Sequence, residues 1–315
     1  MTAGAPAKEN ANSMNWLVIG IGDISRKRVI PAILSEPRST LHSILTRDPR
    51  KARDYPDAHI YTNLDDALQN KRVDAVYIAT PVALHAPQAI AALQAGKHVL
   101  CEKPAALNFR DANQMKDAAA RQLLGIAYYR RLFPKLLDAK RRIEQGEIGQ
   151  PVLAEANCHG WLPPPERAWL LDPNQAGAGP LYDIACHRVD TINFLFGNPA
   201  SARGLTSNAV HKTQVEDSAT ILIDYETGPR AIVDVRWNSR IERDQFRIIG
   251  TDGEIDLSPL SGPPNHENVH YPLIENFVSA MLGEAELACP IEESLKTDRV
   301  LEAVRLDQPL ESIHA

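Results

Sequence analysis

The chain has few of the residues that mark disulfide-rich or zinc-binding proteins. Its 315 residues include only four cysteines, and no two of them form a Cys-x-x-Cys pair. This spacing signals neither a disulfide framework nor a thiolate zinc site, so we expect reduced thiols. The cysteines are Cys101, Cys158, Cys186 and Cys289.

The sequence also lacks a basic excess and a long apolar run. Its formal net charge is -6, and no stripe of Lys and Arg interleaves with aromatic residues, which argues against a nucleic-acid partner. No stretch approaches the roughly 18 apolar residues of a membrane span, and residues 1–14 contain no apolar signal-peptide core. We therefore expect a cytoplasmic protein without a membrane partner, preceded by a disordered tail over residues 1–14.

The first part of the chain alternates strand-like and helical patterns. Apolar spacing near 3.6 residues at 84–95 and 110–121 predicts helices between the strands. This alternation predicts a parallel sheet with helical crossovers over residues 15–128. Pro31 should kink the first helix or fix its start. The predicted strands are 16–20, 41–46, 73–79, 97–101 and 123–127.

The second part is expected to form an α+β domain over residues 129–315, so the fold class is α/β overall. Its alternating strands predict a large, mostly antiparallel open sheet, with turns at Gly228-Pro229 and 251–253. The last two helices are expected to pack back on the body of the protein, with the first domain as a candidate surface. The predicted strands are 219–225, 230–237, 245–249 and 254–257, and the predicted helices are 134–145, 180–196, 273–282 and 294–306.

A glycine turn follows the first predicted strand and opens a helix. Gly20 and Gly22 would let the backbone approach a pyrophosphate, and the helix amino terminus supplies free N–H groups. Asp23 and Ile24 follow, and Ser25 takes the place of the third small residue. A tight turn without a ligand would carry the same glycines, but the strand-turn-helix context favours a dinucleotide.

The end of the second strand bears on cofactor choice. An acidic residue there would bind the ribose 2′-hydroxyl of NAD, whereas an arginine would accept the 2′-phosphate of NADP. Thr46 and Arg47 suit the phosphate, and Asp48 comes one or two positions late for the NAD role. NADP is therefore favoured over NAD, although Arg47 as a simple solvated charge is the alternative.

Two groups of polar residues suggest a catalytic site. Glu102 and Lys103 directly follow the strand 97–101, where open α/β sheets bind their ligands. Asp183 and His187 are four positions apart on a predicted helix, so they share a face as a base and its orienting carboxylate. An ordinary helix salt pair is the alternative. A metal is not expected, because no further set of ligands stands at a suitable spacing.

A third group, Thr80-Pro81-x-x-x-His85, lies just past the strand 73–79. Its position places it at the same edge of the sheet as the glycine turn. His85 either lines the cofactor cleft or caps the next helix.

Together these residues resemble the glucose-fructose oxidoreductase and inositol dehydrogenase family, often written Gfo/Idh/MocA. The likeness runs nearly from end to end, and the Glu-Lys-Pro element coupled to Asp-x-x-x-His is its specific part. The matching motifs are Gly20-x-Gly22, Thr80-Pro81-x-x-x-His85, Glu102-Lys103-Pro104, Tyr129-Arg130 with Pro134, Trp169-x-x-Asp172-Pro173, Gly177-Ala-Gly179, Asp183-x-x-x-His187 and Phe246-x-Ile-x-Gly250.

The resemblance implies that residues 15–128 form a Rossmann dinucleotide-binding domain, followed by the substrate-binding domain 129–315. It implies an oxidoreductase that transfers a hydride between NAD(P) and a hydroxyl-bearing carbon of a sugar, inositol or related polyol. It implies that Lys103 binds the reacting oxygen, that His187 is the general base, and that Asp183 holds the substrate or the histidine. It also implies a homodimer or homotetramer formed through the sheet of the second domain. The expected cofactor-binding residues are Gly20, Gly22, Asp23, Ile24, Ser25, Thr46, Arg47, Thr80, Pro81, His85, Glu102 and Lys103. The expected substrate-binding residues are Lys103, Tyr129, Arg130, Trp169, Asp183 and His187.

Three departures from the family pattern bear on the substrate. Ala178 and Ala185 replace glycines and add one methyl group each, whereas Leu170 replaces an arginine usual after Trp169 and removes a charge from the substrate wall. Two other functions stay open. Tyr129 would act as the acid if the substrate were an enone or a dihydrodiol, and a dinucleotide-binding regulatory protein would need no turnover.

Overall fold

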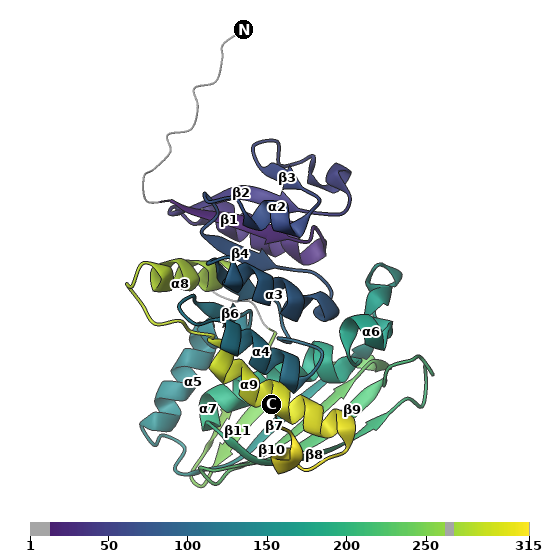
Figure 1. Cartoon of the computed structure of the whole chain (residues 1–315). Coiled ribbons are helices and arrows are strands. Elements are labelled where there is room, and N and C mark those ends of the chain that lie inside the picture. The colour runs from purple at the N-terminus through teal and green to yellow at the C-terminus, as the bar shows by residue number, and fades with distance from the viewer. Residues whose placement is uncertain (1–12, 262–267, 315) are drawn as a thin grey trace.

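The computed structural model describes residues 13–261 and 268–314, which form two six-stranded sheets with helices packed around them (Figure 1). Most of the predicted tail, residues 1–12, lies outside the described residues, as do residues 262–267 of the segment 261–268, which the sequence suggested as a pocket loop that helps to decide the substrate. The predicted fold class is confirmed: a parallel sheet is followed by a mixed, mostly antiparallel one.

The first sheet is parallel throughout and has the strand order β3-β2-β1-β4-β5-β6. Residues Trp16, Leu17 and Val18 of β1 are all fully buried, as expected for a parallel strand covered on both faces. Because β2 and β4 flank β1 on opposite sides, the chain reverses its direction of winding there, and a ligand cleft is expected at that point. The strands are β1 Met14–Ile19, β2 Ser39–Leu45, β3 His59–Tyr61, β4 Ala75–Ile78, β5 His98–Cys101 and β6 Leu124–Ile126.

Short helices and turns connect these strands. Pro31 is the second residue of α1, directly after the π-helical turn η1, so it stands at the start of an α-helix, where a missing N–H is tolerated. The connecting elements are η1 Ser25–Val29, α1 Ile30–Ser35, η2 Pro49–Ala52, α2 Leu64–Leu68, η3 Val82–Leu84, α3 His85–Gln94 and α4 Phe109–Ala118. After β6, η4 Tyr129–Leu132 and α5 Pro134–Glu144 lead into the second sheet.

The second sheet has the order β12-β11-β7-β10-β9-β8. All of its neighbouring strands are antiparallel except the pair β7 and β10. The strands β3, β7 and β8 were not among those predicted, and β11 is longer than the predicted 245–249. The bounds are β7 Pro151–Trp161, β8 Pro199–Ser207, β9 Ser218–Tyr225, β10 Arg230–Arg236, β11 Asn238–Gly250 and β12 Glu254–Asp256.

Helices cover one face of this second sheet, where α9 crosses it in Figure 1. Along β9, Ala219, Ile221 and Ile223 are buried, whereas the side chain of Leu222 between them is exposed. The apolar face of the sheet therefore lies against the helices, and the opposite face carries Leu222. The helical elements are η5 Pro165–Leu171, α6 Pro173–Ala176, η6 Leu181–Ala185, α7 Cys186–Phe196, α8 Tyr271–Met281, α9 Ile291–Leu306 and η7 Leu310–Ser312.

The helix α8 returns to the first sheet. The ring of Phe277 lies 5.5 Å from that of Trp16 on β1, and α8 also contacts α1. The helix α9 packs between the two halves, against α4, α7 and β8. The two C-terminal helices α8 and α9 therefore contact both halves of the protein and hold the two sheets in position relative to one another.

Candidate active site

A cleft of about 1290 Å³ lies at the carboxyl ends of the strands of the first sheet. Its lining runs from the glycine turn after β1 to the residues of η6 and α7 beside the second sheet. Nearly all the residues predicted to bind cofactor or substrate border this one cleft. They are Gly20, Gly22, Asp23, Ile24, Thr46, Arg47, Thr80, Pro81, His85, Glu102, Lys103, Tyr129, Arg130, Trp169, Asp183 and His187.

The glycine turn has the geometry of a phosphate cradle. Gly20 has φ +94°, and a Cβ there would come within 2.8 Å of the carbonyl oxygen of Ala79, so only glycine fits. A Cβ on Gly22 would meet nothing within 4 Å, which leaves open space at the start of the helix that follows. Ser25 does not border the cleft; it is buried, and its hydroxyl donates to the carbonyl oxygen of Gly20 at 2.6 Å. Ser25 therefore braces the turn, and the open side of Gly22 fits a dinucleotide pyrophosphate.

At the end of β2, the charged side chain that can meet a ligand is Arg47 rather than Asp48. The carboxylate of Asp48 accepts hydrogen bonds from Nε (2.8 Å) and Nη2 (3.0 Å) of Arg50, and from the Arg50 backbone N–H. The guanidinium of Arg50 lowers the pKa of Asp48. Among the described residues Arg47, which borders the cleft, forms no hydrogen bond or ion pair. Asp48 is thus occupied by its own turn, whereas Arg47 is available to a ligand.

His85 contacts two loops. It is the first residue of α3 and is buried, with Nδ1 2.9 Å from the carbonyl oxygen of Pro104 and Nε2 2.9 Å from that of Thr80. Burial lowers the pKa of His85, so the neutral ring donates to one carbonyl at a time. The ring therefore lies between the loop after β4 and the Glu-Lys-Pro loop and bonds to one of them in each tautomer.

Lys103 and Asp183 bring the two halves of the cleft together. The ammonium group of Lys103 lies 2.9 Å from the carbonyl oxygen of Asp183 and 3.2 Å from its carboxylate, to which Arg167 of η5 also donates at 3.1 Å. Burial opposes the charge of Lys103, but the fields of Cys186, Asp183 and Glu102 outweigh burial and raise its pKa. Burial likewise opposes the charge of Asp183, and Lys103 and Arg167 outweigh it and lower the pKa of Asp183. Lys103 is therefore a cation and Asp183 an anion at neutral pH.

His187 is a neutral imidazole in the wall of the cleft. Burial, followed by the charges of Arg130, Lys103 and Arg188, holds the pKa of His187 well below its ordinary value. Its Nδ1 is buried and has no hydrogen-bond partner among the described residues. None of their hydrogen bonds joins His187 to Asp183, although the spacing had suggested that pair. In this geometry Asp183 holds Lys103 rather than the histidine.

Behind Lys103, a buried chain of polar side chains holds Glu102. The hydroxyl of Tyr77 donates to Glu102 Oε1 at 2.8 Å, and Nε2 of His270 lies 3.4 Å from the same oxygen. The His270 ring stacks on Tyr129 at 4.9 Å, and Tyr129 meets the His187 ring edge-on at 5.5 Å. Glu102 borders the cleft but is committed to these neighbours, so its position fixes the loop that carries Lys103.

The substrate wall accommodates the departures from the family pattern. Ala178 and Ala185 are buried, and Leu170 belongs to a small apolar cluster with Trp237. The cation that Leu170 does not provide stands three positions earlier, because Arg167 places its guanidinium on Asp183. The expected loss of charge from this wall is thus offset by Arg167.

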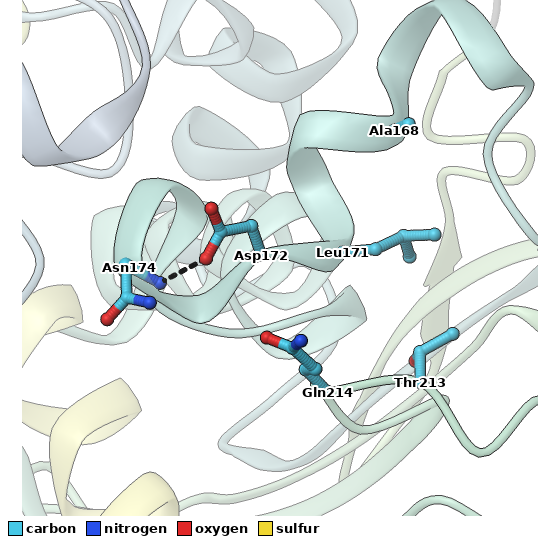
Figure 2. A pocket seen from close by; sticks show the side chains of 6 residues that line it. All are labelled: Ala168, Leu171, Asp172, Asn174, Thr213 and Gln214. Atoms are coloured by element: carbon cyan, nitrogen blue, oxygen red, sulfur yellow. Dashed lines mark hydrogen bonds between the residues drawn. The ribbon is translucent and has the colours of Figure 1, made fainter.

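A second hollow, of about 510 Å³, lies outside this cleft (Figure 2). Asp172 is the titratable residue in its lining, and its carboxylate accepts the backbone N–H of Asn174 at 2.9 Å and the side-chain amide of Gln175. These bonds cap α6 and leave no free base. The main cleft is therefore the candidate active site.

Sequence reasoning missed several residues of this site. Arg167, Arg188 and His270 border the cleft, but none stands in a spaced pair with a predicted catalytic residue. Arg188 is the neighbour of His187, which was a usable signal. Within residues 13–261 and 268–314, no group of three or more His, Cys, Asp or Glu is placed to hold a metal ion. No helix in those ranges is long and apolar enough to cross a bilayer.

Comparison with known protein families gives two matches that follow one another along the chain. Residues 14–127 match the oxidoreductase family with an NAD-binding Rossmann fold, and residues 136–256 match the GFO/IDH/MocA C-terminal domain. Together they span both sheets of the structure.

Individual relatives agree with these matches. The chain is 32% identical over 247 residues to 1,5-anhydro-D-fructose reductase of Ensifer adhaerens, covering 76% of this chain and 74% of the relative. It is 26% identical over 268 residues to the NADP-dependent D-xylose 1-dehydrogenase of Haloarcula marismortui, covering 80% and 74%. The crystal structure of the aldose-aldose oxidoreductase of Caulobacter crescentus superposes with a TM-score of 0.84, at 23% identity over 94% of this chain and 99% of that one. This last similarity concerns the fold.

Proposed function

The chain belongs to the GFO/IDH/MocA family of NAD(P)-dependent oxidoreductases, and we propose that it transfers a hydride between NADP and a hydroxyl-bearing carbon of a sugar, inositol or related polyol. One observation carries the proposal. Lys103 from the first sheet and Asp183 and His187 from η6 and α7 border one cleft, and the glycine turn borders the same cleft.

The chemistry divides between cofactor and protein. The bound dinucleotide supplies a nicotinamide carbon that accepts or returns a hydride. His187 is neutral and buried, so it can take the proton from the substrate hydroxyl as the C–H bond is broken. The ammonium group of Lys103, held by Asp183, stabilises the negative charge that develops on the substrate oxygen. In the reducing direction His187 returns the proton to the oxygen.

The preference for NADP over NAD is part of the proposal. Two features support it: Gly22 leaves open space at the start of the helix for a pyrophosphate, and Thr46 and Arg47 border the same cleft at the end of β2, where dinucleotide-binding sheets meet the adenosine ribose. Asp48, the acidic residue nearest that position, is held by Arg50. A relative that uses NADP, the D-xylose 1-dehydrogenase, supports the same choice.

We further propose a homodimer or homotetramer in the cytoplasm. The outer face of the second sheet is open and exposes Leu222 beside Ile232 of β10, with Arg203 and Glu155 on either side of these two apolar residues, so this face is available to a second copy. The four cysteines are free thiols, three of them buried, which suits a reducing compartment.

The proposal is tested by following absorbance of the reduced nicotinamide with NADP and a panel of aldoses, polyols and inositols, together with their acidic and phosphorylated derivatives. We expect at least one member of the panel to be oxidised, and Lys103→Met and His187→Ala each to lower kcat by about 100-fold or more. The Kd of NADP should change far less. Weaker NADP binding with an unaltered kcat would contradict the assignment of both residues.

A further inference from the structure

Two arginines beside His187 are buried without enough negative charge to balance them. Arg130 of η4 and Arg188 of α7 both border the cleft, and they are 8% and 1% exposed. Nε and Nη1 of Arg130 and Nε of Arg188 have no hydrogen-bond partner among the described residues. A buried guanidinium with unpaired N–H groups is costly, so the pair requires an explanation.

The contacts of these arginines include a single carboxylate. Nη2 of Arg188 donates to Asp244 at 2.7 Å, whereas Nη2 of Arg130 donates only to the hydroxyl of Ser261, at 3.3 Å. Lys135 adds a third cation nearby and donates to the backbone carbonyl oxygens of Leu257 and Pro259. Burial lowers the pKa of Arg130 and Arg188 lowers it further, and the opposing effects of Tyr129 and Asp244 do not restore it, as expected for a cation with too little negative charge beside it.

Arg130 and Arg188 lie next to His187, the proposed general base, rather than next to the glycine turn. Arg188 directly follows His187 in the chain, and Arg130 lies 4.9 Å from the centre of the Tyr129 ring, which itself meets His187 at 5.5 Å. The cofactor pyrophosphate has its own cradle at Gly22. Sugar hydroxyls would satisfy some N–H groups but would leave the excess charge in place, whereas an oxyanion would satisfy both needs.

We propose that the substrate carries an anionic group, a carboxylate or a phosphate, and that Arg130 and Arg188 bind this group beside His187. The inference rests on the proposed hydride transfer at this cleft and narrows the substrate class to acidic or phosphorylated sugars and polyols. Guanidinium groups bind carboxylate and phosphate oxygens through paired N–H donors, which suits either group.

The test compares three ligands that share a six-carbon chain: D-glucitol, D-gluconate and D-glucitol 6-phosphate. Each is titrated into the protein saturated with NADPH, which cannot oxidise them, and binding is followed by nicotinamide fluorescence in a buffer free of phosphate, sulfate and carboxylates. We expect at least one of the two anions to bind about tenfold or more tightly than D-glucitol. The tighter of the two identifies carboxylate or phosphate.

Variants assign the preference to the arginines. Arg130→Met should reduce the ratio of anion to glucitol affinity to below about threefold, whereas Arg141→Met, which removes the same charge from the exposed surface of α5, should leave it unchanged. Asp244→Asn keeps both arginines and removes the carboxylate that Arg188 contacts, so it should increase the ratio. Equal affinities for the three ligands in the unaltered protein, or equal losses in Arg130→Met and Arg141→Met, would overturn the proposal. A ratio that falls in Asp244→Asn would overturn the part assigned to Arg188.

These outcomes are separable from the proposed function. Oxidation of neutral sugars without any preference for anions in binding would refute the anionic substrate and leave the hydride transfer standing. The opposite result is also possible: the protein binds the anions preferentially, Arg130→Met abolishes that preference, and no sugar or polyol, whether neutral, acidic or phosphorylated, reduces NADP. This result would support the anion site and refute the proposed function.

Discussion

The ammonium group of Lys103 donates hydrogen bonds to the backbone carbonyl oxygen of Asp183 at 2.9 Å and to its carboxylate at 3.2 Å. The two residues are 80 positions apart, one at the end of the first sheet and the other in η6 beside the second. Because the backbone carbonyl takes part, the lysine is aimed by the path of η6 as well as by charge. The side chain of each residue is 15% exposed, so the cation faces the cleft from a fixed position.

This contact predicts that Asp183→Asn changes the protonation of Lys103 more than its position, because the substitution keeps the backbone carbonyl oxygen that Lys103 contacts. After burial and Cys186, Asp183 is the main influence on the pKa of Lys103, and it raises that pKa. In Asp183→Asn the alkaline limb of kcat should therefore move to lower pH, and kcat should fall by about 100-fold. The measurement is kcat against pH, with Asp138→Asn on the surface of α5 as the control. An alkaline limb that stays in place would show that Lys103 does not carry the essential charge.

The burial of His187 predicts where the acidic limb of the pH profile of kcat/KM lies. Since burial, then Arg130 and Lys103, lower its pKa, the ring stays neutral from neutral pH down to below the ordinary value of 6.5. Alcohol oxidation should thus keep its kcat/KM to below pH 6.5 and lose it as His187 becomes protonated. Arg130→Met removes one of these charges, so the limb should move upward, whereas Arg141→Met should not move it. A limb above pH 6.5 in the unaltered enzyme would argue for a different base.

The end of β2 predicts how cofactor preference changes. Arg47→Ala removes the available cation at the cleft and should lower kcat/KM for NADP by about tenfold while leaving the value for NAD within about twofold. The preference is obtained from initial rates with each cofactor. Arg50→Ala is the informative comparison, because it frees the carboxylate of Asp48 and should favour NAD. A preference unaltered in Arg47→Ala would mean that Arg47 is a solvated charge.

The fold could be predicted from the sequence where the apolar pattern is local. The strands of the first sheet other than β3 appear as apolar runs, and the helices between them show the expected spacing. The strand β7 was not predicted because its outer face carries the polar residues Glu155, Asn157 and His159, and the residues between them on the inner face are small. The segment therefore lacks the large apolar residues that mark a strand. It is stabilised by pairing with β10 and β11, which no local pattern reveals.

The candidate site divides in the same way. Motifs pointed to Lys103, Asp183 and His187 because each stands at a recognisable place in the chain. Arg167 could not be assigned, since its contact with Asp183 depends on how η5 packs against η6. Conversely, the helical spacing of Asp183 and His187 suggested a hydrogen bond that is not among those of the described residues, because the carboxylate is taken by Lys103 and Arg167.

The exposed face of the second sheet predicts an effect on assembly. Leu222 is 47% exposed and lies opposite Ile232 on β10, so Leu222→Glu would place a carboxylate in any interface formed there. We expect this variant to sediment as a smaller species than the unaltered protein. Val152→Glu, near the start of β7, changes an apolar residue that is 44% exposed and serves as a comparison. An assembly unaffected by Leu222→Glu would exclude this face as the interface.

Asp298 predicts a stability that falls as the pH rises. This residue of α9 is 6% exposed, and its carboxyl accepts a hydrogen bond from Ser294 Oγ at 2.9 Å. Burial raises the pKa of Asp298 to about 7 from 3.8. The folded protein therefore binds a proton that the unfolded chain has released above about pH 4, and the benefit of that proton is lost as the pH rises through 7. At 1.36 kcal/mol per pKa unit, the loss amounts to as much as about 4 kcal/mol.

Asp298→Asn isolates this contribution, because asparagine keeps an acceptor for Ser294 and cannot ionise. The variant should gain stability relative to the unaltered protein as the pH is raised from 5 to 8, which urea unfolding at several pH values would measure. Asp117→Asn, on the exposed side of α4, controls for the loss of one carboxylate from the surface. If the stability difference between Asp298→Asn and the unaltered protein were the same at pH 5 and pH 8, Asp298 would have to be ionised in the fold throughout that range. Its negative charge would then need a counter-charge close to α9, and the other carboxylates there, Asp190 and Glu302, raise the pKa of Asp298 rather than lower it.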